Sequence, residues 1–179
     1  MKSQPPTINT PNEYANLYPR PPLLSSFQTQ WQRISMVYTH QTATDELPEV
    51  THLLHGVAIF TTPGISEWTI DGTTKVDSNT PGDIVIVPAN VGHSTRWQSE
   101  AKIIVIGLEN SLFAEANDET LHSTQPKLRP QFPTADPLVY RLGLSLKSVL
   151  EQDPNGSRLY AETTAAMLAV HLLQHYSDR

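Results

Sequence analysis

The sequence contains no cysteine among its 179 residues. Disulfide bonds, thiolate nucleophiles and cysteine-ligated zinc sites are therefore excluded. Long apolar runs are missing as well: no stretch approaches the roughly 18 residues of a membrane span, and the opening MKSQPPTINTPNEY lacks the apolar centre of a secretory signal. Without export signals or disulfides, we expect a cytoplasmic protein with no membrane partner.

Positive charge is scarce. Twelve Lys and Arg against eighteen Asp and Glu give a net charge of −6, and the positive residues are scattered singly. A DNA-binding domain normally presents a basic face, so we expect this chain by itself to bind nucleic acid poorly. Glycine is limited to eight residues, and neither a Gly-rich phosphate loop nor a Gly-x-Ser-x-Gly nucleophile motif occurs. Nucleophilic and phosphate-binding enzymes therefore have no support.

The length fits one domain with an appended element, and the sequence pattern changes twice along the chain. Residues 1–22 are rich in Pro, Ser, Thr and Asn and form an N-terminal arm. The arm is either partly disordered or folds over a pocket with its YPRPPLL segment. Residues 23–110 carry short apolar runs between turns, which is typical of a closed β-sandwich or barrel. Residues 111–179 are predicted to be a helical extension.

The most informative stretch is Pro81–Trp97, PGDIVIVPANVGHSTRW. The Pro-Gly pair sets a tight turn, and the β-branched residues 84–87 form a buried strand. Pro88 ends this strand because it has no N–H to donate, and His93 begins the return strand after a polar turn. Asp71-Gly72 predicts a further hairpin. Other strands are expected over 31–40, 50–62, 66–72, 73–76, 94–98 and 102–108.

Metal coordination is the first chemistry to consider at His93, because a metal site needs several convergent ligands. The candidate partners are His52 and His55, but a three-residue step on one regular strand sends two side chains to opposite faces. No Gly lies between them to favour a bulge, and the next acid, Glu67, follows a predicted turn. We therefore expect no metal site and no cofactor.

Small-molecule binding is the second possibility. His93, Thr95 and Trp97 share one strand face, because alternate residues of a strand point the same way. An imidazole and an indole on one inward face make a wall for a small ligand, and Trp68 and His52 are predicted to line the same pocket. The alternative is that His93 is a turn histidine bonded to the backbone and that the indoles simply fill the core.

The C-terminal part predicts three helices. NSLFAEA begins at an N-cap, Asn110 or Ser111, and a loop with three prolines covers residues 122–136. Asp136-Pro137 then opens a second helix. Its expected apolar stripe consists of Leu138, Leu142, Leu146, Val149 and Leu150.

A turn, DPNGS (153–157), leads to the last helix, which is capped by Ser157 and forms an antiparallel pair with the one before it. This helix is apolar over more than one face. One interpretation is that it merely covers the barrel. The other is that it also forms a homodimer seam, since a wide apolar stripe needs two surfaces to bury against. The expected seam residues are Leu159, Ala166, Met167, Val170 and Leu173.

Gly82, Pro88 and His93 match Gly-x5-Pro-x4-His, the second motif of the cupins. With the strand KIIVIGLEN, the short helix after it and the closing LYAETTAAMLAVHLLQHYS, the chain resembles the N-terminal cupin domain of AraC/XylS-family transcription regulators over most of residues 20–177. The resemblance implies a mainly β fold, a cupin-type double-stranded β-helix barrel followed by a C-terminal antiparallel helix pair. It also casts His93 and Trp97 as pocket residues and the arm as a cover.

In that family a linker leads from such a domain to two helix-turn-helix motifs, which this sequence does not contain. We therefore expect a fragment or a stand-alone domain that meets DNA only through the missing C-terminal domain. The implied function is sensing of an unidentified small-molecule effector and dimerisation, without catalysis. Two alternatives stay open: a small metal-dependent cupin enzyme, such as a dioxygenase or isomerase, and a metal-free cupin with a purely structural role.

Overall fold

The computed structural model describes residues 4–119, 127–153, 155 and 157–178, which form eleven strands and four helices. None of the helices in these ranges is both long and apolar enough to cross a membrane. The strands are β1 (Thr7–Ile8), β2 (Leu24–Ser25), β3 (Ile34–Gln41), β4 (Glu46–His52), β5 (His55–Phe60), β6 (Gly64–Ile70), β7 (Thr73–Asn79), β8 (Asp83–Val87), β9 (His93–Trp97), β10 (Ala101–Leu108) and β11 (Gln131–Ala135). The helices are α1 (Pro11–Ala15), α2 (Asn110–Glu119), α3 (Pro137–Gln152) and α4 (Arg158–Tyr176).

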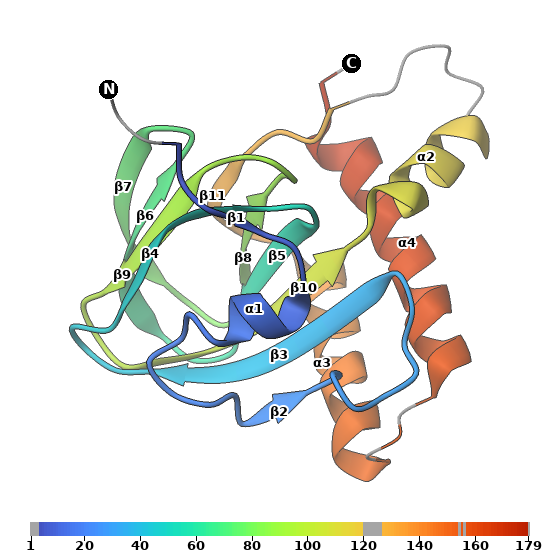
Figure 1. Cartoon of the computed structure of the whole chain (residues 1–179), viewed down its shortest axis with the longest axis horizontal. Coiled ribbons are helices and arrows are strands. Elements are labelled where there is room, and N and C mark those ends of the chain that lie inside the picture. The colour runs from blue at the N-terminus through green and yellow to red at the C-terminus, as the bar shows by residue number, and fades with distance from the viewer. Residues whose placement is uncertain (1–3, 120–126, 154, 156, 179) are drawn as a thin grey trace.

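The strands form two sheets that face each other (Figure 1). One has the order β1-β4-β9-β6-β7 and the other the order β11-β8-β5-β10-β3-β2. From β3 to β10 the strands alternate between the two sheets, apart from the β6-β7 hairpin, which stays in the five-stranded sheet. This is the pattern of a double-sheet jelly roll, the arrangement to which cupins belong. The fold is therefore a cupin-like β-sandwich, with α2, α3 and α4 gathered on one side of it (Figure 1).

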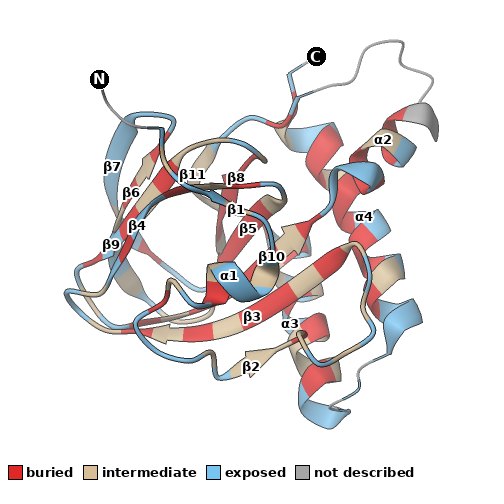
Figure 2. Cartoon of the chain, in the orientation of Figure 1, coloured by how far each residue is buried: buried red, intermediate tan, exposed pale blue. Residues whose placement is uncertain are grey.

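The six-stranded sheet is buried on both faces, which explains its continuous apolar runs. On β5, Val57 and Ile59 belong to the apolar cluster under the helices, whereas Ala58 and Phe60 belong to the cluster between the sheets. Figure 2 accordingly shows buried residues along β5 and β8. The five-stranded sheet has one exposed face, so on β9 buried residues alternate with partly or fully exposed ones. The interior between the two sheets is where a ligand could be enclosed.

The Pro81–Trp97 segment folds as predicted, with β8 and β9 on either side of a turn. Gly82 has a φ of +97° and Asn90 a φ of +63°, both in the left-handed region that tight turns use. The predicted hairpin at Asp71-Gly72 is also confirmed, because both residues have positive φ as a type I′ turn requires. These turns set the point at which His93 enters the interior.

The prediction of one strand over residues 50–62 is wrong. The chain breaks at Leu53 and Leu54, so β4 belongs to the five-stranded sheet and β5 to the six-stranded sheet. Strand β11 was missed because it lies in the expected proline-rich loop. Its pairing with β8 shifts register between Gln131 and Thr134, and this irregularity accommodates Pro133. Residues 122–126 of that loop lie outside the described residues.

Helix α3 begins as expected, since the Asp136 carboxylate accepts a hydrogen bond from the Val139 amide at 3.0 Å. The expected stripe is right in part: Leu146 and Leu150 are buried, Leu142 and Val149 are only partly buried, and Leu138 is 39% exposed. The true core-facing residues are Val139, Gly143, Leu146 and Leu150. Helix α2 begins at Asn110 itself, so neither Asn110 nor Ser111 precedes it as a cap.

Helix α4 is capped by Ser157, whose hydroxyl accepts from the Tyr160 amide at 3.2 Å. Pro154 and Gly156 of the predicted turn lie outside the described residues. Helix α4 contacts α2 more extensively than α3. The expected seam residues are divided between its faces: Leu159, Ala166 and Met167 are exposed, Val170 is partly buried, and Leu173 is buried in the chain's own core. Leu173 therefore cannot face a partner, because the seven-residue step drifts around a 3.6-residue helix.

Candidate ligand-binding site

A cavity lies between the two sheets, at the end of the sandwich that the N-terminal arm covers. The space open to the centres of water molecules is about 50 Å³. At roughly 10–15 Å³ for each such centre, it has room for about three to five waters. Its lining is mostly apolar: Ile8, Asn9, Thr10, Pro11, Tyr14, Phe27, Ser35, Val37, His52, Leu54, Gly56, Val57, Ala58, Trp68, Val87, His93, Val105, Ile106 and Gly107.

The arm is folded against the sandwich from residue 4 onward, but it covers the cavity with residues 8–14 and not with the expected YPRPPLL segment. Strand β1 pairs in parallel with β4, with Ile8 opposite His52. Thr10 caps α1 by accepting from the Glu13 amide at 3.2 Å, and Pro11 occupies the first turn, where a missing N–H costs nothing. In Figure 1, α1 lies in front of the sandwich, between β1 and β3. The arm therefore supplies one wall of the cavity.

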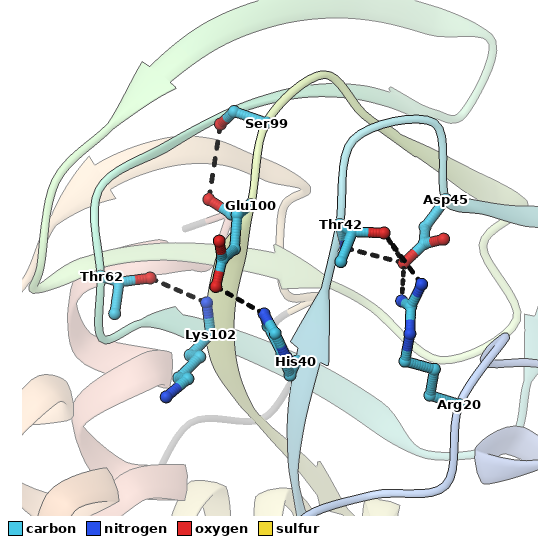
Figure 3. Close-up of polar contacts among 8 residues, drawn as sticks. All are labelled: Arg20, His40, Thr42, Asp45, Thr62, Ser99, Glu100 and Lys102. Atoms are coloured by element: carbon cyan, nitrogen blue, oxygen red, sulfur yellow. Dashed lines mark hydrogen bonds and ion pairs between the residues drawn. The ribbon is translucent and has the colours of Figure 1, made fainter.

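Arg20 anchors the end of the arm to the turn between β3 and β4 (Figure 3). Its guanidinium pairs with the Asp45 carboxylate and donates to the Thr42 hydroxyl at 2.9 Å. Burial opposes ionisation of Asp45, but the Thr42 amide and Arg20 outweigh it and lower the pKa of that carboxyl. This contact fixes the chain after α1 to the sandwich.

Three aromatic rings meet where the arm crosses the cavity. The imidazoles of His52 and His93 lie edge to face, with their centroids 4.7 Å apart. The Tyr14 ring stands edge-on to His52 at 4.9 Å and lies 6.4 Å from His93. The Tyr18 hydroxyl donates to the Tyr14 hydroxyl at 3.2 Å. Tyr14 thus links the arm to both histidines of the sandwich.

Both imidazoles are neutral near pH 7. Burial, followed by the neighbouring His52, lowers the pKa of His93 to about 3. Burial also lowers the pKa of His52, against the opposing effect of the Leu54 carbonyl. The Nδ1 atom of His52 lies 2.9 Å from that carbonyl oxygen, and that of His93 lies 3.4 Å from the Val91 carbonyl. A carbonyl only accepts, so Nδ1 of His52 carries the proton.

The residues at this site do not fit a metal ion of the kind that metal cupins hold. In the described part of the chain, no three His, Asp or Glu side chains converge. His55 lies on the other side of the sheet, where its Nδ1 accepts from the Ala89 amide at 3.1 Å and its ring packs on Phe113. His52 and His93 alone are fewer ligands than divalent-metal sites use. The sequence predicted that His52 and His55 point to opposite faces of one strand. In the structure they are separated because the chain breaks between β4 and β5, which belong to different sheets.

The predicted pocket residues are all buried, but they do not all line the cavity. Besides His52 and His93, the Trp68 indole contributes to the wall, and its Nε1 donates to the Ser66 hydroxyl at 3.0 Å. Thr95 and Trp97 share the inward face with His93 as expected, yet neither reaches the cavity. Trp97 packs edge-on to Trp68 with centroids 6.1 Å apart, so for Trp97 the core-filling alternative applies.

Sequence reasoning missed the arm residues that form the cavity wall. It selected YPRPPLL, whereas Tyr14 and the residues just before α1 are the ones in place. The signal was present: Thr10-Pro11-Asn12-Glu13 has an N-cap, a proline at the first helical position and an acid three residues after the cap. Gly56 and Gly107 also line the cavity. Nothing in the sequence indicated this, because it depends on which side chains pack around them in the folded protein.

Comparison with models of known protein families gives no match, and comparison with curated protein sequences gives none either. Part of the chain is similar to the cupin domain of Cnp3 from Schizosaccharomyces pombe, with 17% identity and a TM-score of 0.42 over 55% of this chain and 70% of that one. A cupin superfamily protein from Desulfitobacterium hafniense gives 18% identity and a TM-score of 0.41 over 46% and 72%. For oxalate decarboxylase from Bacillus subtilis the identity is 18% and the TM-score 0.39, over 45% of this chain and 22% of that one. The fold assignment rests on the strand order described above.

Proposed function

We propose that this chain is a small-molecule-sensing domain, the effector-binding and dimerisation domain of an AraC-type transcription regulator. The observation that carries the proposal is a largely apolar cavity inside the sandwich that the chain's own N-terminal arm covers, with Tyr14 set against His52 and His93. Mostly apolar pockets with a few convergent polar groups are the usual form of small-molecule sites.

The proposed mechanism is linkage between the ligand and the arm. A ligand in the cavity would touch both the sandwich wall, at Trp68 and His93, and the covering arm, at Ile8 and Tyr14. It would therefore bind the arm-closed state more tightly than an open state and shift the population toward closure. In a regulator this shift is transmitted to DNA-binding domains by a dimer contact or by the free surface of the arm.

A homodimer through α4 is part of this proposal. Leu159 is 76% exposed and Met167 is 48% exposed, and the exposed Ala166 lies between them in sequence. Figure 2 shows exposed residues along the outer side of α4. At about 100° per residue, Ala166 lies about 20° and Met167 about 80° around the helix from Leu159. The three side chains therefore form one apolar stripe that association would bury. DNA contact is expected only through a domain outside this sequence.

An enzymatic role is the alternative that this proposal sets aside. The site offers two imidazoles and no carboxylate, which are fewer ligands than a divalent-metal centre uses. Metal analysis of protein purified without chelator should give well below one equivalent of Fe, Mn, Ni or Zn. One equivalent that is lost on His93→Ala would instead favour the metal-dependent cupin enzyme.

A thermal-shift screen of uncharged and charged metabolites tests the sensing proposal, because a ligand that binds only the folded state raises Tm. Each stabiliser is then measured on Ala58→Leu, which adds side-chain volume at the cavity wall. The control is Ala135→Leu, the same change at an exposed position of β11, outside the cavity and the α4 surface. Stabilisation lost in Ala58→Leu and kept in Ala135→Leu supports the proposal. The proposal fails if no compound stabilises the protein, or if stabilisation survives Ala58→Leu.

A further inference from the structure

The cavity has no charged side chain in its lining: none of its residues is Asp, Glu, Lys or Arg. The two imidazoles are held neutral by burial. A carboxylate, phosphate or ammonium group on a ligand would therefore lose its hydration without gaining a counter-charge, which costs several kcal/mol. The ligand that this cavity accepts must be uncharged in the part that enters it.

One strong acceptor is directed at the cavity. Because Nδ1 of His52 donates to the Leu54 carbonyl, Nε2 of the neutral ring carries a lone pair. Within the described part of the chain this Nε2 has no hydrogen-bond partner, and it lies on the side of Gly56, another lining residue. A Cβ at Gly56 would stand 3.2 Å from Cε1 of His52 and 3.9 Å from Nε2. Glycine therefore keeps the lone pair accessible from the cavity.

A second polar group, the Tyr14 hydroxyl, comes from the arm that covers the cavity. The Tyr14 hydroxyl accepts the proton of Tyr18, so its own proton is available for donation. The Tyr14 ring is edge-on to His52, at 4.9 Å between centroids, and both side chains line the cavity. A ligand hydroxyl at this end of the cavity would use His52 as the acceptor of its proton and Tyr14 as a donor. A hydroxyl satisfies both, because it donates one hydrogen bond and accepts others.

Size limits the rest of the ligand. The space of about 50 Å³ is about a third of the roughly 150 Å³ of an engineered protein cavity that binds benzene. One six-membered ring is therefore the upper limit, and it fits only with outward movement of the arm. The walls that would hold it are Trp68 and the aliphatic side chains of Val37, Val87 and Val105. Apolar contact would supply affinity, and the two polar atoms would fix the orientation.

We infer that the cavity binds an uncharged, single-ring compound that carries a hydroxyl group, with the hydroxyl donating to Nε2 of His52 and accepting from Tyr14. This inference depends on the proposed function only in taking the cavity as a ligand site. An apolar ring of the same shape would leave the His52 lone pair without a hydrogen bond. An acid of the same ring size would bring a charge into the cavity.

The test is a 1H–15N NMR titration at pH 7.5 with phenol, toluene and benzoate, following the amides of His52, Gly56 and Gly107. Phenol and toluene differ by the hydroxyl, and benzoate adds the charge. We expect phenol to bind about 3- to 10-fold more tightly than toluene, the factor for one net hydrogen bond, and benzoate to leave these amides unmoved. His52→Phe should bring the phenol-to-toluene ratio to about one, whereas His55→Phe, which alters the histidine outside the cavity, should preserve it.

Tyr14→Phe provides a second variant on the arm, where a change in packing is less disruptive than inside the sandwich. It should weaken the binding of phenol and leave the binding of toluene unaffected. Equal affinities for phenol and toluene in the unmodified protein, or benzoate binding at the same amides, would overturn the hydroxyl inference while leaving a ligand cavity in place. If none of the three compounds moves the cavity amides, this inference falls, whereas the sensing proposal still depends on the outcome of the thermal-shift screen.

Discussion

Acidification between pH 7.5 and 5.0 should destabilise this protein through His93. The side chain is 2% exposed, and burial, with His52 beside it, lowers its pKa from 6.5 to about 3. Between pH 6.5 and about pH 3, His93 binds a proton in the unfolded chain and not in the folded one. The contribution of His93 to stability is therefore full above pH 6.5 and falls as the pH drops below it. At 1.36 kcal/mol per unit, the loss from His93 at pH 5.0 is about 2 kcal/mol. For a chain of this size the Tm should fall by roughly 4–8 °C.

Urea unfolding followed by tryptophan fluorescence at pH 5.0, 6.0, 7.5 and 8.5 measures this effect. No change from His93 is expected between pH 7.5 and 8.5, which gives an internal control. Asp45 and Asp136, whose pKa values are lowered, lose their contribution only below about pH 4. In His93→Gln the difference between pH 7.5 and 5.0 should shrink by about 2 kcal/mol. An unchanged difference in this variant would refute the idea that His93 is buried and neutral.

Three further predictions concern packing and association. Gly143→Val should destabilise the fold by about 1–3 kcal/mol in urea unfolding, because even a Cβ there would lie 2.4 Å from Cδ1 of the buried Ile59; no loss would mean that α3 does not press on β5. Asp136→Ala should cost about 1–3 kcal/mol, since its carboxylate accepts from the Val139 amide, His171 and Tyr176; calorimetry showing an unchanged Tm would contradict this. Met167→Glu should convert the dimer to a monomer, as measured by sedimentation. If the unmodified protein is already monomeric at micromolar concentration, the prediction of a dimer seam on α4 is wrong.

The strands and turns that depend on local signals could be predicted from the sequence. Gly82 and the Asp71-Gly72 pair mark turns because few other residues adopt positive φ, and the run at 84–87 marks a strand buried on both faces. The break at Leu53-Leu54 carries no turn residue, so it was missed. Strand β11 contains Pro133, which ordinarily argues against a strand and is tolerated only beside the irregularity in its pairing.

The candidate site was predicted in part for the same reason. Alternation along β9 and β6 correctly placed His93 and Trp68 on inward faces. It could not tell that Trp97 lies beyond the cavity, because depth along the sandwich depends on pairing between strands far apart in sequence. Nor could it place Tyr14 against His52, a contact that forms only when the arm adds β1 to the edge of β4.

Hydrogen exchange of the arm tests the central claim most directly. Amides of residues 7–16 and 52–58 are followed by mass spectrometry with and without a saturating amount of the best stabiliser from the thermal-shift screen. If the cavity is a ligand site covered by the arm, exchange of both segments slows, and neither segment responds in Ala58→Leu. Slowed exchange elsewhere, with residues 7–16 unchanged, would contradict the account.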